Sequence, residues 1–473
     1  MPDKAVEEAK ERVRSAIKNS GADFPARRIT VNLAPADLPK EGPSFDLPMA
    51  VGILLASEQL IKVDLSKALF LGELSLDGSL RHTAGVLPLV LLAKEKNFKK
   101  VYLPSINSEE ASVVQGVEVF PVANLLQLFR ALSGTEDLKP VPHTSFKKLL
   151  QGTPFEFDFQ EIQGQEQAKR ALEIAAAGGH NVFMKGTPGS GKTMLARAFP
   201  GILPELTEDE AMEVTKIYSI TGNLPEGQSV VRYRPFRSPH HTTSRIGLIG
   251  GGTKPMPGEI SLGHRGVLFL DEFPEFPRHV LEALRQPMED GVVTISRAAG
   301  TVSYPAQFLL IAAANPCTCG YYGSNTKQCS CMPGQISRYQ KRISGPILDR
   351  IDIHLDIPQV KVEKLVGEGA SGDSSEKIQK RVQAARDLQL NKFAKIGIKS
   401  NSEMNTRLVR EFCQLSSDCQ TLMRQATTQL NLSARSYYKV LKIARTVADL
   451  EASANINSVH ISEALQFRPK VDL

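Results

Sequence analysis

The chain contains no tryptophan, and aromatic residues make up only 6% of it. Proteins that stack single-stranded nucleic acid on aromatic platforms need more such side chains, so this mode of binding is disfavoured. No apolar run is long enough to cross a bilayer, so a membrane partner is not expected. The charged N-terminal residues have no apolar signal core, and we therefore expect a cytoplasmic protein.

Cysteine is also scarce, with six residues among 473. In a chain without a secretory signal, reduced thiols or metal ligands are expected rather than disulfides. The hydrophobic fraction of 41% and the charged fraction of 23% are those of an ordinary globular protein. The net charge of +6 is modest for this length, so the distribution of the basic residues matters more than their number.

One segment carries a complete phosphate-binding pattern. Residues 186–193 read GTPGSGKT, which matches G-x-x-x-x-G-K-[S/T] at every fixed position. An apolar run precedes it and a helical run follows, and this order points backbone N–H groups at phosphate oxygens. Lys192 would contact the β- and γ-phosphates of ATP, and the Thr193 hydroxyl would bind Mg²⁺. The residues expected to hold the nucleotide are Gly186, Thr187, Pro188, Gly189, Ser190, Gly191, Lys192 and Thr193.

Two further apolar runs end in polar side chains. Residues 267–270 precede Asp271 and Glu272. Asp271 would hold Mg²⁺ through water, and Glu272 would act as the general base for the attacking water. A solvated acidic turn is the alternative, which the phosphate-binding loop upstream makes less favourable. Residues 308–314 are followed by Asn315, whose side-chain amide could orient that water. Most asparagines at strand ends, however, only cap turns.

Four of the six cysteines form two C-x-C pairs, Cys317 with Cys319 and Cys329 with Cys331. Two thiol pairs could hold one Zn²⁺ tetrahedrally and fasten the loop after Asn315. C-x-C is less common than C-x-x-C in zinc sites, so unligated thiols are the alternative. Zinc with four protein ligands would be structural, because no coordination position is left open.

Basic residues gather between 230 and 265, where six Lys and Arg stand against one acid. A positive, glycine-bearing loop suits a phosphodiester backbone that is contacted without sequence preference. The alternatives are a solvated basic surface or residues that serve a subunit interface. His240 and His241 lie in this stretch, but without a third ligand at usable spacing a metal site is disfavoured. The candidate contacts to nucleic acid are Arg232, Arg234, Arg237, Arg245, Lys254 and, near the tip of a second expected hairpin, Arg297.

The pattern along the chain favours an α/β protein with several domains. An α+β domain is followed by a proline-containing linker and then by alternating strand and helix signals, which predict a parallel sheet. The last part of the chain has a helical pattern throughout. The first domain, the linker, the sheet domain and the helical domain are expected at 1–134, 135–159, 160–360 and 361–473.

The order of these motifs resembles an AAA+ ATPase and, more narrowly, the magnesium-chelatase-like family of ComM and YifB. The AAA+ order ends with LSARSYY at 432–438. The narrower resemblance rests on SPHHTTS at 238–244, GEISLGHRGVLFLDEFPEF at 258–276 and SGPILDRIDI at 344–353, and the match extends over nearly the whole chain. It implies a P-loop AAA+ core with a parallel sheet and a C-terminal helical lid.

The resemblance also implies roles for three residues. Asn315 matches the first sensor, Arg350 the arginine finger offered to the neighbouring subunit's γ-phosphate, and Arg435 on the lid the second sensor. A guanidinium suits both arginine positions because it is always charged and binds phosphate through two N–H groups. Without the resemblance, an ordinary surface ion pair is the better interpretation of Arg350. The family implies a hexameric ring, with the basic insertion projecting into its pore.

The first domain resembles the Lon-protease fold. Residues 39–44 look like the segment that carries the Lon nucleophile, which makes Ser44 the candidate, and 72–78 match the segment that follows. The position of the general-base lysine falls on Leu87, and a leucine cannot deprotonate a hydroxyl. We therefore expect a non-proteolytic domain that supports assembly or partner docking. Members of the family carry further strand sequence ahead of the helix near Ala5, so this domain is expected to be shortened at its N-terminus.

The leading hypothesis is an ATP-hydrolysing ring motor that acts on DNA. The resemblance implies helicase-like branch migration during recombination of incoming DNA, with ATP and Mg²⁺ as cofactors and structural Zn²⁺ as a further candidate. The expected partners are DNA, further copies of the chain and recombination proteins. A chelatase-type remodeller of a protein substrate is the second hypothesis, and an ATP-dependent Lon-like protease is the third.

Overall fold

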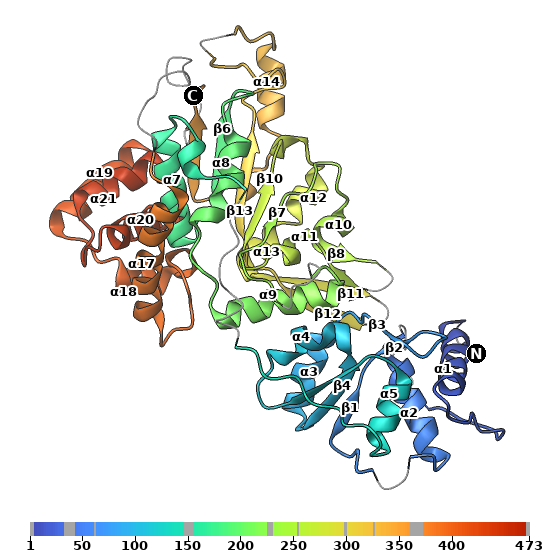
Figure 1. The fold of residues 1–473 in the computed structure, drawn as a ribbon. Coiled ribbons are helices and arrows are strands. Elements are labelled where there is room, and N and C mark those ends of the chain that lie inside the picture. The colour runs from blue at the N-terminus through green and yellow to red at the C-terminus, as the bar shows by residue number, and fades with distance from the viewer. Residues whose placement is uncertain are drawn as a thin grey trace. The chain divides into compact units, whose positions relative to one another are not determined.

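The computed structural model describes residues 4–32, 43–60, 63–145, 156–224, 230–252, 255–297, 300–324, 327–359 and 372–469. The chain forms two compact units, and each is made of segments that are separated in the sequence (Figure 1). The first unit comprises Met1–Gly152 and Thr207–Arg232, and the second comprises Thr153–Leu206 and Tyr233–Leu473.

The first unit is an α+β domain with a three-stranded parallel sheet. The sheet has the order β1 (Ala68–Phe70), β4 (Lys100–Pro104) and β5 (Glu118–Val122). One aromatic ring from each strand stacks on the next, with successive centroids 4.9 Å apart. The helices of its N-terminal segment are α1 (Lys4–Asn19), α2 (Asp46–Ala56), α3 (Val86–Glu95), α4 (Ser108–Ser112) and α5 (Leu125–Leu132).

Helix α9 (Glu208–Thr221) packs in the first unit, although it follows the phosphate-binding loop in the chain. Thr207 and Glu210 form a capping box at its start: the Thr207 hydroxyl accepts from the N–H of Glu210 at 3.3 Å, and the Glu210 carboxylate accepts from the N–H of Thr207 at 3.2 Å. Near its other end, the Ser219 hydroxyl donates to the buried carboxylate of Glu110. The sequence pattern assigned this helix to the sheet domain, whereas these contacts fix it to the α+β domain.

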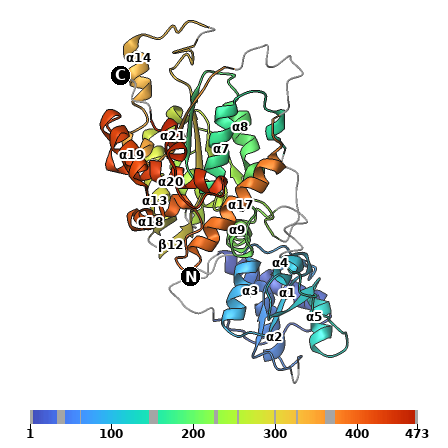
Figure 2. The same ribbon diagram turned by 90° about the vertical axis from the view of Figure 1, so that its left-hand side faces the viewer.

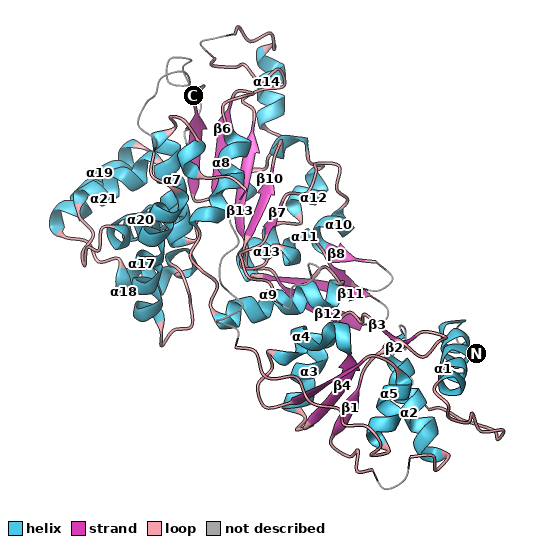
Figure 3. Cartoon of the chain, in the orientation of Figure 1, coloured by secondary structure: helices cyan, strands magenta, loops and turns pink. Residues whose placement is uncertain are grey.

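The second unit is built on a five-stranded parallel sheet (Figure 3). The strand order is β14 (Ile353–Ile357), β6 (Val182–Gly186), β13 (Leu309–Ala314), β10 (Val267–Leu270) and β7 (Phe236–Arg237). Because every pairing in this sheet is parallel, all five strands end at the same edge. Strands β10 and β13 are apolar and buried along their whole length, as central strands of a parallel sheet are. The predicted α/β class is confirmed.

The C-terminal residues form a helical region that shares its hydrophobic core with the sheet. Its helices are α17 (Ser375–Phe393), α18 (Thr406–Phe412), α19 (Ser417–Gln429), α20 (Ala434–Leu450) and α21 (Ser458–Gln466). Figures 1 and 2 show them gathered beside α7 (Glu166–Gly178). One apolar cluster runs from Met184 in the sheet through Ala175 of α7 to Val447 of α20. The expected helical C-terminal region is confirmed, and it is joined to the sheet by close packing rather than separated from it.

None of the helices in the described residues is long and apolar enough to pass through a bilayer.

Candidate active site

The phosphate-binding loop lies between β6 and α8 (Lys192–Ala198), at the edge where the sheet strands end. Gly189 and Gly191 have φ angles of 75° and 90°, a left-handed conformation that other residues disfavour. A Cβ atom on Gly186 would lie 2.5 Å from the carbonyl oxygen of Ile357, so a larger residue would push β14 away. The glycines of the motif are therefore required by the turn and by the contact with the neighbouring strand.

The loop contains two buried hydroxyl groups. The Oγ1 of Thr187 and the Oγ of Ser190 are buried and make no hydrogen bond to any described residue. Buried polar atoms are nearly always paired in folded proteins, so unpaired ones indicate a missing ligand. Both hydroxyls belong to a loop that precedes a helix N-terminus, where phosphate oxygens are favoured. The loop therefore fits a nucleotide phosphate.

Lys192 is buried at the start of α8. Its Nζ donates to the carbonyl oxygens of Gly186 at 2.8 Å and Thr187 at 3.0 Å, and to the Oδ1 of Asn315 at 3.3 Å. Burial lowers the pKa of Lys192, and the negative charge of Asp271 opposes this effect. The ammonium group thus has only neutral acceptors in its hydrogen bonds, and a phosphate would supply a charged one.

Thr193 and Asp271 meet at the same edge of the sheet. The hydroxyl of Thr193 donates to the Oδ2 of Asp271 at 2.9 Å, although the residues are 78 positions apart. A hydroxyl and a carboxylate beside a phosphate site are oxygen ligands that Mg²⁺ uses, with waters completing the shell. These two residues could hold the metal, which would neutralise phosphate charge.

Glu272 has a left-handed backbone with a φ of 50°, unusual for a residue other than glycine. Its carboxylate contacts the Nδ1 of His241 at 3.0 Å, and it is about half exposed. The sequence did not predict this contact of His241. It depends on the parallel pairing of β7 with β10, the strand that ends just before Asp271, and no local pattern indicates that pairing. Unusual backbone geometry of this kind is concentrated at functional sites.

Arg350 and Arg435 lie at the opposite edge of the sheet. Arg350 precedes β14, whose first residue, Ile353, pairs with Val182 at the start of β6. The phosphate-binding loop follows the other end of β6, roughly 16 Å away for a strand of five residues. The guanidinium of Arg435 contacts Glu289, which Arg350 also contacts. Both arginines therefore lie at the end of the sheet opposite to the phosphate-binding loop of their own chain.

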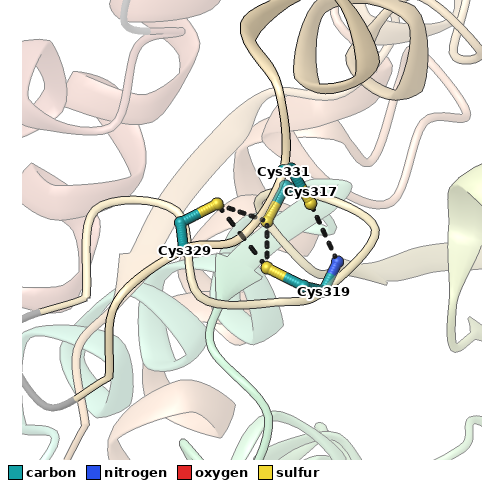
Figure 4. Close-up of side chains that lie close together, drawn as sticks. All are labelled: Cys317, Cys319, Cys329 and Cys331. Atoms are coloured by element: carbon teal, nitrogen blue, oxygen red, sulfur yellow. Dashed lines mark hydrogen bonds between the residues drawn. The ribbon is translucent and has the colours of Figure 1, made fainter.

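The four clustered cysteines bring their sulfur atoms together (Figure 4). All four Sγ atoms lie within 4.8 Å of one another. The sulfur atoms of Cys317, Cys319 and Cys329 are 3.4 to 3.7 Å apart, and the backbone N–H of Cys319 donates to the sulfur of Cys331. Tetrahedral zinc with bonds of about 2.3 Å would place its sulfurs roughly 3.8 Å apart. Hydrogen bonds from backbone N–H groups, first that of Tyr321, lower the pKa of Cys319 to about 5 and so favour the thiolate.

The cysteine loop is in contact with the phosphate-binding loop. A Cβ atom on Gly320 would lie 2.6 Å from the ring of Pro188 and 3.9 Å from the Cγ of Asn315. Gly320 also has a φ of 85°, so both its conformation and its surroundings require glycine. A change in the conformation of the cysteine loop would therefore displace Pro188 of the phosphate-binding loop.

Two of the basic residues between 230 and 265 form hydrogen bonds within the protein. Arg234 donates to the carbonyl oxygens of Pro204 at 2.6 Å and Arg265 at 2.7 Å, and Arg237 forms a two-pronged pair with Glu259. Guanidinium groups held in this way support the local fold, and contacting a phosphodiester would require breaking these bonds.

Of the other basic candidates in this stretch, Arg232 is partly buried, with an Nε atom that has no hydrogen-bond partner among the described residues. Lys254 lies outside the described residues.

Arg245 and Arg297 are exposed instead. Arg245 begins α10 (Arg245–Ile249), and Arg297 ends β11 (Val292–Arg297), which forms a hairpin with β12 (Gly300–Pro305). A Cβ atom on Gly251 would lie 3.2 Å from the guanidinium of Arg297 and 3.5 Å from Ile246 of α10. Gly251 of the insertion thus lies beside Arg297 of the hairpin.

In the first unit, the position of the Lon general base is occupied by a buried leucine. Leu87 is 0% exposed, and its backbone N–H donates to the carboxylate of Glu110 at 3.1 Å. Ser44, the nucleophile candidate, is only half-buried. A hydroxyl needs a base within hydrogen-bond reach to become nucleophilic, and a leucine provides none.

Three family models match consecutive parts of the chain. "Subunit ChlI of Mg-chelatase" matches residues 1–107, "Magnesium chelatase, subunit ChlI" matches 158–365, and "Magnesium chelatase, subunit ChlI C-terminal" matches 372–468. The competence protein ComM of Haemophilus influenzae is 43% identical over 475 residues, which cover 100% of this chain and 92% of the relative. The uncharacterized protein YifB of Escherichia coli is 43% identical over 469 residues, covering 99% and 90%. The magnesium-chelatase subunit ChlI of Olisthodiscus luteus is 28% identical over 226 residues, covering 44% and 59%.

Proposed function

The chain belongs to the magnesium-chelatase-like AAA+ ATPase family of ComM and YifB, and on that premise we propose that it is an ATP-driven ring motor that moves on DNA. The family implies the use of ATP and Mg²⁺. The name of the relative from Haemophilus influenzae, a competence protein, supports a role in branch migration during recombination of incoming DNA. Such work would be done in the cytoplasm, together with recombination proteins.

The observation that carries the proposal is the division of the catalytic residues between two edges of one sheet. Lys192, Thr193, Asp271, Glu272 and Asn315 gather where the strands end, and the two arginines stand where the strands begin. A closed ring of identical subunits can place the second edge of one copy against the first edge of the next. We therefore propose that each ATP binds between two copies, in a hexamer as the family implies.

In this arrangement each side chain has a defined task. The loop N–H groups and Lys192 bind the phosphates, while Thr193 and Asp271 hold Mg²⁺, which supplies charge neutralisation when it is bound. Glu272 takes a proton from the attacking water, and Asn315 orients that water. Arg350 and Arg435 of the neighbouring copy stabilise the negative charge that develops on the γ-phosphate.

We propose that DNA contacts the basic surface formed by α10 and the β11–β12 hairpin. Arg245 and Arg297 are its exposed cations, and such contacts to phosphates would be independent of sequence. Arg234 and Arg237 are less suited to this task because they already bind backbone oxygens and a carboxylate. A chelatase-type remodeller of a protein substrate is the second candidate, favoured by the match to the magnesium-chelatase subunit models.

DNA-stimulated ATP hydrolysis separates the two candidates. We expect single-stranded or branched DNA to raise the ATPase rate of the whole chain severalfold, and the Arg245→Ala/Arg297→Ala double variant to lose most of that increase while keeping its basal rate. Lys380→Ala removes an exposed cation from α17 and serves as the matched control. No stimulation by any form of DNA would reject the DNA motor and leave the protein remodeller.

We also propose that the four cysteines hold a structural Zn²⁺, and that the first unit is a non-proteolytic docking or assembly module. The convergence of the four sulfur atoms supports the zinc site. The buried leucine at the position of the general base supports the loss of proteolysis. Casein degradation that disappears in a Ser44→Ala variant would overturn the second statement and revive the Lon-like protease.

A further inference from the structure

Glu289 lies between the two arginines that the proposed function assigns to the neighbouring copy. It belongs to the short helix α13 (Arg285–Asp290). The Nη2 of Arg350 donates to the Oε1 of Glu289, and the Nη2 of Arg435 donates to the same oxygen at 3.3 Å. In the chain, Arg350 is 61 residues from Glu289 and Arg435 is 146 residues from it. Three separate segments thus meet at one carboxylate oxygen.

The surroundings of the three residues distinguish them from an isolated surface ion pair. The side chain of Arg350 is only 10% exposed, and its Nη1 donates to the carbonyl oxygen of Pro346 at 2.6 Å. Its Nε is buried and has no hydrogen-bond partner among the described residues. Glu289 and Arg435 are about half exposed. An anchored guanidinium beside a second guanidinium at the surface is an arrangement that suits the binding of an anion.

Two guanidinium groups at this spacing repel each other unless an anion lies between them. The carboxylate of Glu289 offsets this repulsion and draws both groups toward one point. Because the pair would act on a reacting phosphate, its geometry matters more than the small stability that an exposed ion pair contributes. A displacement of about 1 Å at a reacting centre is enough to cost roughly 10²-fold in rate.

We propose that Glu289 is a positioning residue, which holds Arg350 and Arg435 together so that both can bind the γ-phosphate of a nucleotide in the neighbouring copy. This inference rests on the proposed function. Glu289 itself touches no nucleotide: it acts through the two arginines and belongs to the same copy as they do.

Steady-state ATPase measurements on the whole chain test this role. For Glu289→Gln and Glu289→Ala we expect kcat to fall roughly 10- to 100-fold, since the arginines lose their common anchor. The KM for ATP and the binding of a fluorescent ATP analogue should stay unchanged, because the phosphate-binding loop is intact. Glu289→Asp keeps the charge and should recover part of kcat. Glu376→Gln, which removes an exposed carboxylate of an ion pair on α17, is the matched control and should behave as the unaltered chain does.

Mixing two inactive variants tests whether the role is exerted across the interface. Glu289→Ala subunits keep an intact phosphate-binding loop, and Lys192→Ala subunits keep an intact arginine pair. In mixed rings, some interfaces join the intact arginine pair of one variant to the intact phosphate-binding loop of the other. We therefore expect the mixture to be severalfold more active than the sum of its components. A mixture no more active than that sum would mean that Glu289 serves its own subunit, and the proposal would be wrong.

The outcomes also separate this inference from the proposed function. If the unaltered chain does not hydrolyse ATP, the proposed function fails. If it does, and Arg350→Ala abolishes the activity while both Glu289→Gln and Glu289→Ala keep the full kcat, only the role of Glu289 is rejected. Thermal unfolding of each variant shows whether it is folded, and Glu289→Gln, which keeps the shape of the side chain, replaces Glu289→Ala if the latter unfolds.

Discussion

The two edges of the sheet in the second unit differ in the groups that they bring together for binding a phosphate. At the edge where the strands end, Lys192 is hydrogen-bonded to Asn315, and Thr193 is hydrogen-bonded to Asp271. Two buried hydroxyls of the phosphate-binding loop have no partner among the described residues and could bind a phosphate. At the edge where the strands begin, two arginines share one carboxylate and lie at the end of the sheet opposite to the phosphate-binding loop of their own chain. On the proposed function, the first edge binds the nucleotide, and the second edge contributes its arginines to the site of a neighbouring copy.

The strongest test of this comparison is the removal of Arg350. We expect Arg350→Ala to lower kcat for ATP by about 10³- to 10⁵-fold, the range known for arginine fingers, because the charge that develops on the γ-phosphate loses its partner. ATP binding, measured by fluorescence of an analogue, should be retained. Hydrolysis at the normal rate by Arg350→Ala would show that the second edge takes no part in the reaction.

Glu272 tests the first edge. Glu272→Gln should lower kcat by about 10²- to 10⁴-fold, since an amide cannot accept the proton of the attacking water. The variant should still bind ATP and form the ring, which can be followed by light scattering. His241→Ala, which removes the contact to this carboxylate together with the ring contacts to His240 and Phe276, should have a much smaller effect.

Between the two edges lies His354 on β14, and its titration affects stability. Burial is the main cause that lowers the pKa of His354 to about 4, so the folded chain keeps it neutral. The unfolded chain takes up this proton near pH 6.5, so the free energy of unfolding should decrease as the pH falls from about 6.5 to 4 and then cease to change on this account. The decrease is about 3 kcal/mol at most. Urea unfolding of His354→Gln should show a shallower dependence in that window, and an unchanged dependence would contradict the assignment.

The cysteine loop supports the first edge through its contact with Pro188. We expect about one zinc per chain by elemental analysis, and a Cys319→Ser/Cys329→Ser variant should lose it. The ATPase rate should then fall roughly tenfold, because the loop that carries Asn315 loses its fastening while the phosphate-binding loop keeps its sequence. Full zinc content in the double variant would disprove the site. Cys413→Ser, a change at a buried cysteine outside the cluster, is the control and should leave the zinc content unaffected.

Local sequence predicted the strand ends at Asp271 and Asn315 because apolar runs followed by polar residues are a short-range signal. Local sequence also contains the capping box of α9, which joins residues three positions apart. It did not predict that α9 packs in the first unit, since this depends on a contact between Ser219 and Glu110, which are 109 residues apart. Nor did it predict the contact between His241 and Glu272, which needs the parallel pairing of β7 with β10.

The sequence by itself predicted the chemistry that we propose at the nucleotide. The phosphate-binding loop and the pair of carboxylates are patterns of a few residues, because their tasks depend on local backbone geometry and side-chain type, whereas the arginine finger was indicated only by the resemblance to AAA+ ATPases. The tertiary structure decided where these groups stand. Parallel strands send the loop and Asp271 to one edge and Arg350 to the other, and only packing brings Arg435 and Glu289 beside Arg350. Strand order, register and long-range packing are set by the burial of apolar faces over the whole unit, which no short segment encodes.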